Sequence, residues 1–488
     1  MLKLWPFTGG LHLPDHKHES SLLPLQVMPL PKQLIYPLVQ RNGHPINASV
    51  SSGGRVLKGQ VMTESADFNN PPVHAASSGW VKGVEKRPVQ HSSGMDSHCI
   101  VIEVDGLDES VEFKGVADYE TMESKAIRDI IHEAGIVGLG GAAFPTSVKL
   151  GSLKHQDVDT LILNGVECEP YITCDDSLCQ SFPDAVLGGA KILMHVLGVS
   201  RCLLAIEDNM PEALAALENV KSEEDYEGIE IVSVPTIYPT GGERQLIYLL
   251  TGREVPANGI PADVSIICQN VATAAAVHKA VFTGEPLLSR IITVTGKGVR
   301  QPQNLLVRIG TPIAELVEFC GGYTEFAKRL IMGGPMMGFA LSSDALPVTK
   351  ASHCILVASL DEVISEKQAM PCIRCGLCAS VCPVNLLPQQ LYWYARSDNL
   401  ERVIDYHLSD CIECGCCDVV CPSYIPLVEY FRSAKSKVVV KEQEQARADH
   451  ARLRFEARNQ RKQQEQLEKA ESAKRKKELL NKLMRDGN

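Results

Sequence analysis

The 488-residue sequence lacks any apolar run long enough to cross a bilayer. Its longest apolar stretch, residues 185–199, is interrupted by Lys191 and His195, whereas a membrane span needs about 18 or more nearly uncharged apolar residues. The opening residues MLKLWPFTGG lack the continuous apolar segment of a secretory signal, and neither end carries a lipidation motif. We therefore expect a protein of the cytosol with no membrane span.

The body of the chain also lacks the positive charge that nucleic-acid binding requires. Residues 441–488 hold 14 Lys+Arg and 9 Asp+Glu, which leaves 34 Lys+Arg and 50 Asp+Glu, a net charge of −16, in the first 440 residues. An acidic body repels phosphates, so we expect no nucleic-acid partner. The basic tail is the one segment that could bind a duplex by itself.

Composition and length indicate a folded protein of about three or four domains. We expect a multidomain fold that combines an α/β unit with small β modules. The expected order is an N-terminal arm (1–29), a barrel-sandwich domain (30–120), an α/β domain (121–262), a β-grasp domain (263–345), a ferredoxin-type domain with a helical scaffold (362–433), and a charged tail (434–488), helical or partly disordered. The motifs G-x-V-x-x-G-Q and H-A-x-x-S-G-x-V resemble the hammerhead of biotinyl and lipoyl carrier domains, but the turn 69–72 lacks the carrier lysine. We expect a structural role for this module.

Eight of the 17 cysteines form two identical runs, C-x-x-C-x-x-C-x-x-x-C-P. A reducing cytosol argues against disulfides and in favour of metal. In ferredoxins with this spacing, three thiolates hold one 4Fe–4S cluster and the fourth serves the neighbouring cluster. We therefore assign Cys372, Cys375, Cys378 and Cys421 to one cluster, and Cys411, Cys414, Cys417 and Cys382 to the other.

Two alternatives accompany this assignment. A structural zinc site would use two C-x-x-C pairs and would leave the third and fourth cysteines of each run unexplained. Cys416 could replace its neighbour Cys417, but the match between the two runs favours Cys417. The cysteines at 168, 174 and 179 lack a ligand repeat, and we expect buried or free thiols there.

Glycines at 138, 140 and 141 open the α/β region. They would allow backbone N–H groups to approach a phosphate, although a tight packing loop explains the same residues equally well. No strand is expected before this loop, so it is not a Rossmann fingerprint.

A longer series of motifs resembles the flavoprotein subunit of respiratory complex I. The motifs are GLGGAAFPTSVK, NGVECEP, YPTGGE and QNVATA, in that order. The resemblance implies that flavin mononucleotide (FMN) and NADH bind there. It assigns Gly138, Gly140, Gly141 and Lys149 to nucleotide contacts, Asn164, Glu167 and Glu169 to the ring and nucleotide pocket, and Gly241, Gly242, Glu243, Asn270 and Thr273 to the phosphate side. Val166 departs from the acidic residue of that family, and the glycine loop lacks its arginines.

The whole domain order, with GGERQLIYLLTGREVP and RIITVTGKGV, resembles the RnfC family, the C subunits of the Rnf (Rsx) ion-translocating electron-transport complexes. This resemblance implies a peripheral subunit on the cytoplasmic side of the bacterial inner membrane, which exchanges electrons between NAD(H), FMN, two 4Fe–4S clusters and partner subunits that move ions. Chemistry agrees, because NADH gives two electrons as a hydride, a cluster takes one, and a flavin converts between them. The alternative is an electron-relay module that carries only the clusters, without nucleotide chemistry of its own.

Overall fold

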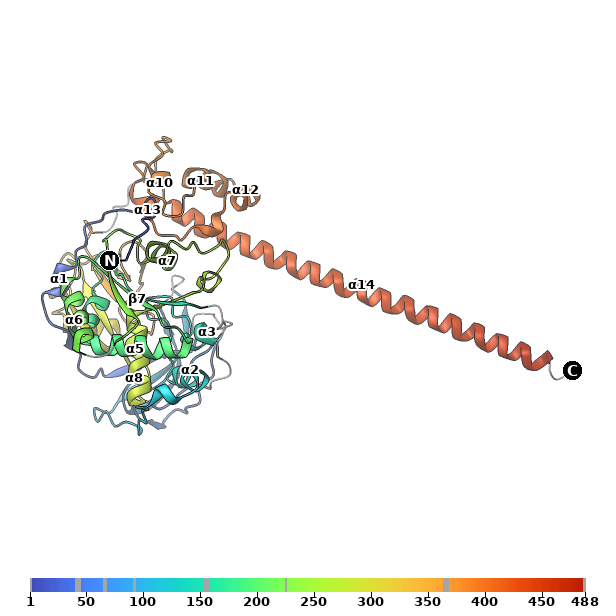
Figure 1. The fold of residues 1–488 in the computed structure, drawn as a ribbon, viewed down its shortest axis with the longest axis horizontal. Coiled ribbons are helices and arrows are strands. Elements are labelled where there is room, and N and C mark those ends of the chain that lie inside the picture. Colours follow the sequence, from blue (N-terminus) through green and yellow to red (C-terminus); the bar gives the residue numbers. More distant parts are fainter. Residues whose placement is uncertain are drawn as a thin grey trace.

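The computed structural model describes residues 2–39, 45–64, 68–90, 94–151, 158–223, 226–362 and 368–485. Three β-sheets with covering helices make up the body, and a cysteine-rich helical unit joins the body to the long helix α14 (Leu427–Arg485) (Figure 1). Short 3-10 helices occur at Tyr119–Thr121, Pro261–Val264 and Leu408–Asp410. The expected multidomain fold with small β modules is confirmed.

The N-terminal β module is built on an antiparallel sheet. Its strands, in the spatial order β2-β5-β4-β3, are β2 (Gln33–Pro37), β3 (Arg55–Val56), β4 (Gly79–Pro88) and β5 (Asp96–Val104). Leu34 and Tyr36 alternate along β2, as Ile100 and Ile102 do along β5, and all four are buried in one core, as the two-residue period of a strand requires. The Tyr36 hydroxyl accepts the backbone N–H of Ala76 at 2.7 Å, so its polar end is satisfied inside the core.

A parallel sheet in the order β8-β7-β6-β9 forms the centre of the α/β domain. Its strands are β6 (Thr160–Gly165), β7 (Cys202–Glu207), β8 (Ile229–Val234) and β9 (Ile266–Asn270). The helices are α2 (Ser124–Glu133), α3 (Thr146–Gly151), α4 (Cys174–Ser181), α5 (Pro183–Leu197), α6 (Pro211–Glu223), α7 (Glu243–Thr251) and α8 (Val271–Thr283). Leu161 and Leu163 face the apolar core that contains α5 and α8, whereas Ile162 faces the core that contains α7. Both faces of the sheet are therefore covered, which explains why its strands are apolar throughout.

The α/β domain extends beyond the boundary expected at residue 262. β9 pairs in parallel with β6, and α8 packs closely on α5, where a Cβ at Gly189 would lie 1.9 Å from the Ala274 carbonyl oxygen. The segment before β9, with Pro256, Gly259 and Pro261, is thus a connection within the α/β domain and not a boundary between domains.

The third sheet contains six strands in the order β1-β11-β10-β14-β12-β13. They are β1 (Gln26–Val27), β10 (Ser289–Thr295), β11 (Gln303–Arg308), β12 (Arg329–Met332), β13 (Phe339–Ala340) and β14 (Cys354–Ala358), and helix α9 (Ile313–Phe319) packs into the same core. β14 lies in the middle of the sheet although it follows the boundary expected at residue 345. β1 comes from the N-terminal arm and pairs in parallel with β11.

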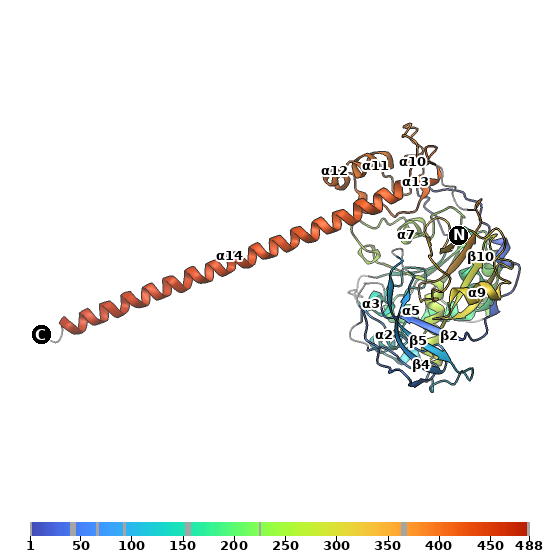
Figure 2. The ribbon, with the colours of Figure 1, turned by 180° about the vertical axis from the view of Figure 1, so that it is seen from behind.

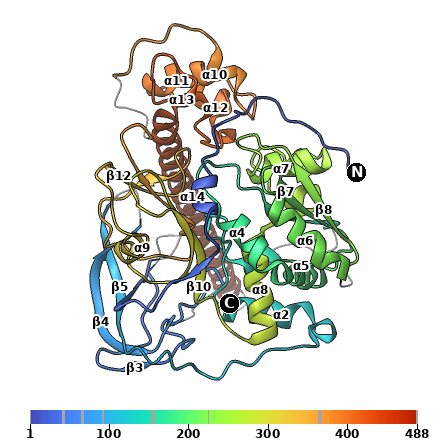
Figure 3. The ribbon, with the colours of Figure 1, turned by 90° about the vertical axis from the view of Figure 1, so that its left-hand side faces the viewer.

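The N-terminal arm crosses the other units, as Figure 3 shows. The Gly10 N–H donates to the Val381 carbonyl of the helical unit at 3.0 Å, and Leu11 exchanges two backbone hydrogen bonds with Tyr238 of the α/β domain. After helix α1 (His18–Ser21) the arm enters the six-stranded sheet. Lys17 fixes the middle of the arm, because its buried Nζ donates to the Glu167 carbonyl at 2.6 Å and pairs with Glu207 Oε2 at 3.3 Å.

The cysteine-rich unit is helical. It contains α10 (Leu377–Ser380), α11 (Pro388–Arg396), α12 (Leu400–Asp405), α13 (Cys416–Val419) and the first turns of α14. Leu427, Val428, Phe431 and Ala434 of α14 are buried in the core of this unit. From residue 439 to residue 482 nearly every side chain is exposed, and the helix projects far from the body (Figures 1 and 2). The tail is thus helical through residue 485, and residues 486–488 lie outside the described part. Within the described ranges, no helix combines the length and the apolar character that a membrane crossing requires.

Candidate functional site

A cavity of about 470 Å³ lies at the carboxyl ends of β6 and β9, the position at which parallel α/β sheets bind ligands. It is lined by residues 139–140, 164, 166–169, 238–239 and 241–245, by Ile172, Cys174, Asp175 and Asn270, and by Met337, His353 and Ile412. Met337 and His353 come from the six-stranded-sheet unit and Ile412 from the cysteine-rich unit. The cavity is therefore a junction of three parts of the chain.

Eight of the twelve residues expected to bind the flavin and nucleotide line this cavity. They are Gly140, Asn164, Glu167, Glu169, Gly241, Gly242, Glu243 and Asn270. Gly138, Gly141, Lys149 and Thr273 do not line it.

The four other residues support the wall from behind. Thr273 Oγ1 accepts the Leu139 N–H at 2.9 Å, and the Gly138 N–H donates to the Phe144 carbonyl at 2.7 Å, which closes the glycine loop on itself. A Cβ at Gly141 would lie 3.5 Å from the His353 ring. Lys149 Nζ donates to Glu243 Oε1 at 2.7 Å, so it orients a carboxylate of the wall.

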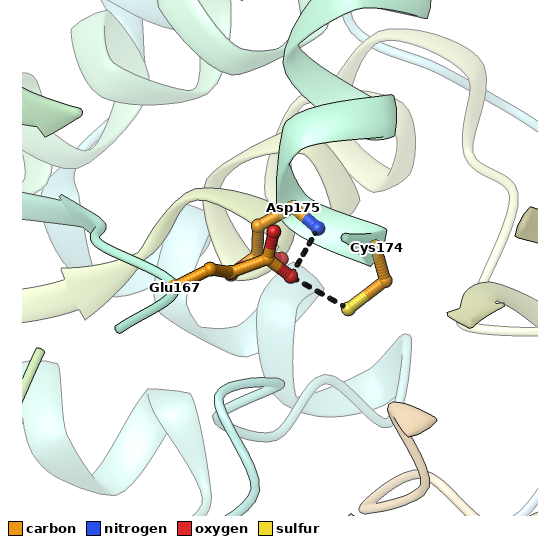
Figure 4. A group of neighbouring side chains, drawn as sticks. All are labelled: Glu167, Cys174 and Asp175. Atoms are coloured by element: carbon orange, nitrogen blue, oxygen red, sulfur yellow. Dashed lines mark hydrogen bonds between the residues drawn. The ribbon is translucent and has the colours of Figure 1, made fainter. Parts of the chain in front are cut away.

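Glu167 holds the first turn of α4 (Figure 4). Its Oε1 accepts the Asp175 N–H at 2.8 Å and the Cys174 thiol at 3.2 Å, and its Oε2 accepts the Asp176 N–H at 3.1 Å. Backbone N–H groups at a helix N-terminus favour a carboxylate. Both oxygens are occupied, so this residue shapes the wall through α4.

Glu169 connects the cavity to the six-stranded-sheet unit. Its Oε1 accepts the N–H groups of Met336 and Met337 at 2.8 and 2.7 Å. Burial raises the pKa of this carboxyl above its ordinary value, and the two N–H donors act in the opposite direction. The loop that carries both methionines is thereby held over the cavity.

The wall is rich in carboxyl groups. Burial, with the charge of Glu167, raises the pKa of Asp175 to about 7, and Asp175 Oδ2 accepts the Asn270 amide at 2.6 Å. Burial lowers the pKa of His353 to about 4, with Arg290 as the second cause, so this imidazole is neutral near pH 7. Sequence reasoning missed Asp175 and His353. The acidic pair at 175–176, in the first turn of a helix, was a usable signal for Asp175, whereas residue 353 carries no motif.

The first turn of α7 meets the requirement of a flavin phosphate. Gly242 is its N-cap and supplies no side-chain oxygen, so the first N–H groups of the helix and its dipole are available to an anion. Asn164 fixes the approach to this turn by donating to the Gly241 carbonyl at 2.9 Å. The volume, the glycine loop and this helix end together fit a flavin mononucleotide.

The eight cysteines of the two runs gather in two further cavities. The distal cavity is lined by Cys372, Cys375, Cys378 and Cys421, and the proximal cavity by Cys382, Cys411, Cys414 and Cys417, with Cys416 beside them. Four convergent thiols are the donor set of a 4Fe–4S cluster. The fourth cysteine of each run lies with the first three of the other run, as the crossed assignment requires.

The two runs share one backbone path, offset by 39 residues. Arg374 and Glu413 both have φ of 57°, and α10 and α13 occupy equivalent positions. The offset makes Cys417 equivalent to Cys378, and Cys416 equivalent to Leu377. Cys416 packs with Tyr238 and Cys414 outside the core that contains Cys417. The repeat therefore favours Cys417 as the third ligand.

The proximal cavity adjoins the cavity of the α/β domain. Ile412 lines both, and the buried Tyr238 hydroxyl donates to the Cys414 carbonyl at 2.6 Å. No residue of the distal cavity lines the α/β cavity. The order in space is therefore α/β cavity, proximal cavity, distal cavity.

Comparison with known proteins agrees with this division of the chain. Residues 5–107 match the RnfC barrel sandwich hybrid domain, 131–279 the Nuo51 FMN-binding domain, 291–340 the SLBB domain and 371–425 the 4Fe-4S dicluster domain. The C subunit of the ion-translocating oxidoreductase complex of Yersinia pestis is 45% identical over 466 residues, which cover 95% of this chain and 74% of that protein. The chain belongs to the RnfC family.

Other members of the RnfC family are longer. The corresponding C subunit of Pseudomonas aeruginosa is 47% identical over 458 residues, which cover 94% of this chain and 59% of that protein. An NAD+-reducing NiFe hydrogenase in its H2-reduced state matches with a TM-score of 0.44 and 20% identity over 62% of this chain and 61% of that chain. As a member of the RnfC family, the protein has an FMN-binding domain and a dicluster domain, with FMN and two 4Fe–4S clusters as cofactors.

Replacing Asp175 should change how stability depends on pH. The folded state keeps the Asp175 proton up to about pH 7, whereas the unfolded chain loses it near pH 4. The folded state thus binds more protons in this window, and stability falls as pH rises through it. Asp175→Asn should remove a fall on the order of 2 kcal/mol between about pH 5 and pH 7.5, measured as the free energy of unfolding at both values. Glu218→Gln, an exposed change on α6, should keep the parent slope. If the free energy of unfolding of Asp175→Asn depended on pH as steeply as that of the parent, Asp175 would not hold a proton in the folded state.

Replacing Cys421 should damage the cluster of the other run. Cys421→Ser is expected to abolish the low-temperature magnetic resonance signal of the cluster held by Cys372, Cys375 and Cys378, because its thiol lines that cavity. Cys416→Ser is the matched control and should leave both signals. Loss confined to the cluster of Cys411, Cys414 and Cys417 in Cys421→Ser would contradict the crossed assignment.

Proposed function

We propose that the chain is the peripheral subunit through which an ion-translocating complex exchanges electrons with NAD(H). Electrons pass between NADH, FMN, the proximal cluster, the distal cluster and partner subunits, in either direction. The observation that carries this proposal is the junction at Ile412 and Tyr238, where the α/β cavity adjoins the cavity of the second cysteine run.

Bound FMN supplies the conversion between the two-electron hydride of NADH and the one-electron clusters. The residues of the chain shape the surroundings of that chemistry. Asn164, Thr273 and Glu167 hold the strand ends, the glycine loop and α4 in place, and the first turn of α7 receives the phosphate. Lys149 keeps Glu243 at the rim of the cavity.

The cluster ligands follow the two cysteine cavities. Cys382, Cys411, Cys414 and Cys417 hold the proximal cluster, and Cys372, Cys375, Cys378 and Cys421 hold the distal one. Burial raises the pKa of Cys411 to about 11, so it is iron binding that makes this thiol a thiolate. Soft thiolate ligands in this number suit iron–sulfur clusters.

The partners are the remaining subunits of the complex, on the cytoplasmic side of the inner membrane, and they move the ions. The first 440 residues carry a net charge of −16, which opposes binding to an anionic lipid surface. Contacts with protein subunits then hold the chain at the membrane.

The acidic lining of the α/β cavity favours the alternative, an electron relay that carries only the clusters, because carboxylates oppose the binding of an anionic phosphate. Glu167, Glu169, Asp175 and Glu243 line the α/β cavity, and Arg244 is the one Lys or Arg among the lining residues that the structure describes. Its guanidinium already donates to the Pro256 and Gly259 carbonyls. Retention of flavin decides between the two functions.

The test is the visible spectrum of the anaerobically purified full chain before and after addition of NADH. We expect one flavin, about eight iron and about eight acid-labile sulfide per chain, and bleaching of both flavin and cluster absorbance by NADH. Clusters without flavin, and without a response to NADH, would support the relay. Stoichiometric zinc with little sulfide would end both hypotheses.

A further inference from the structure

The two halves of the cysteine repeat differ in what covers them. In the second half, Cys414 and Cys416 are only 7% and 1% exposed, because the α/β domain and the loop of Met336 pack against them. The equivalent residues of the first half are Cys375, which is exposed, and Leu377, which is 47% exposed. The same face of one structural unit is therefore covered in one copy and bare in the other.

The bare face is apolar. Met370 and Ile373 are 58% and 67% exposed, and Leu377, two residues after Cys375 of the distal cavity, is exposed as well. The Met370 N–H donates to the Ser423 carbonyl at 2.8 Å, so this segment is fixed against the chain that follows Cys421. Figures 1 and 2 show the segment before α10 at the outer end of the molecule, away from the three sheets. Clustered exposed apolar side chains on a protein surface mark an interaction site.

The segment also departs from the acidic character of the body. Arg374 is the one charged residue in the sequence of residues 368–377, and its side chain is exposed. Its equivalent in the second half is Glu413, which pairs with Arg432 and Lys435 of α14. The charge at this position of the repeat is thus reversed on the face that remains uncovered.

We propose that residues 368–377 form the face through which electrons leave or enter the distal cluster, and that it docks a one-electron redox protein or domain that presents a carboxylate to Arg374. The proposal rests on the proposed function. The repeat supports it, because the equivalent face of the second half lies against the α/β domain that is proposed to hold the flavin. In the transfer, the reduced distal cluster loses one electron and the docked centre gains it, with no proton and no bond exchanged. An apolar centre with charges at its edge is the usual anatomy of such interfaces.

The test uses a reduced plant-type 2Fe–2S ferredoxin, an acidic one-electron carrier, as the probe. The reduced probe is mixed rapidly with the full chain, whose clusters are oxidised. The measured quantity is the second-order rate constant for oxidation of the probe. We expect Arg374→Glu and Ile373→Glu each to lower this rate by about tenfold, and the deficit of Arg374→Glu to shrink as salt is raised, because salt screens the reversed charge. Leu107→Glu, at a 63% exposed position of the β module, should keep the parent rate.

A matched pair of charges at residue 368 separates docking from damage to the cluster. Gln368 is exposed and lies four residues before Cys372, outside the ligand run. Gln368→Glu should lower the rate of probe oxidation by about threefold, and Gln368→Lys should raise it by a similar factor. Iron and sulfide contents show which variants retain their clusters. If the variants at residues 373 and 374 lose iron, the two variants at residue 368 still test whether the probe docks on this face.

A second readout is independent of electron transfer. Arg374→Lys keeps the positive charge and supplies an amine, so zero-length carbodiimide coupling should join residue 374 of this variant to a probe carboxylate. Leu107→Lys supplies an amine at an exposed position of the β module and should give no such product at residue 107. Peptide mass spectrometry identifies the joined residues.

Equal rates in the parent and all cluster-replete variants, or no coupling at residue 374, would overturn the proposed face. Probe oxidation needs the clusters alone, whereas NADH-dependent reduction of ferricyanide tests the flavin site. A chain that oxidises the probe normally but does not respond to NADH would therefore refute the proposed function and leave the docking face standing.

Discussion

The hydrogen bond from the Tyr238 hydroxyl to the Cys414 carbonyl joins parts of the chain that lie 176 residues apart. Around it pack Cys416, Met336 and Leu11, from three different units. Electron transfer between cofactors depends on their separation, so the position of the cysteine-rich unit against the α/β domain determines whether the cofactors form one series. The N-terminal arm reinforces this position, since Leu11 pairs with Tyr238 and Gly10 with Val381.

The parallel sheet determines which residues line the α/β cavity and which hold its wall in place. Asn164 and Asn270 are paired residues at the carboxyl ends of β6 and β9, so the sheet itself brings them together. Glu167 follows β6 and holds α4 by its first N–H groups. Burial raises the pKa of Asp175 to about 7 and raises that of Glu169 above its ordinary value.

Much of the site could be predicted from the sequence where the constraint is local. Cluster ligands follow from cysteine spacing, because a cubane needs thiols at fixed short intervals. Helix α5 follows from an apolar stretch that begins at Pro183 and ends before Gly198. Long-range contacts could not be predicted in this way. Lys149 and Thr273 lie behind the wall, and His353 comes from another unit. Lys17 pairs with Glu207, 190 residues away along the chain. Spacing along the chain carries no information about such pairs, and β9 was separated from its sheet for the same reason.

The most direct test of the account is the order in which the clusters are reduced by NADH in variants that lack one of them. Rapid mixing, followed by low-temperature magnetic resonance of frozen samples, would compare Cys375→Ala, which removes a distal ligand, with Cys414→Ala, which removes a proximal one. We expect rapid reduction of the proximal cluster in Cys375→Ala, and slow or absent reduction of the distal cluster in Cys414→Ala. Rapid reduction of the distal cluster in Cys414→Ala would contradict the series from the α/β cavity through Ile412 and Tyr238 to the two clusters.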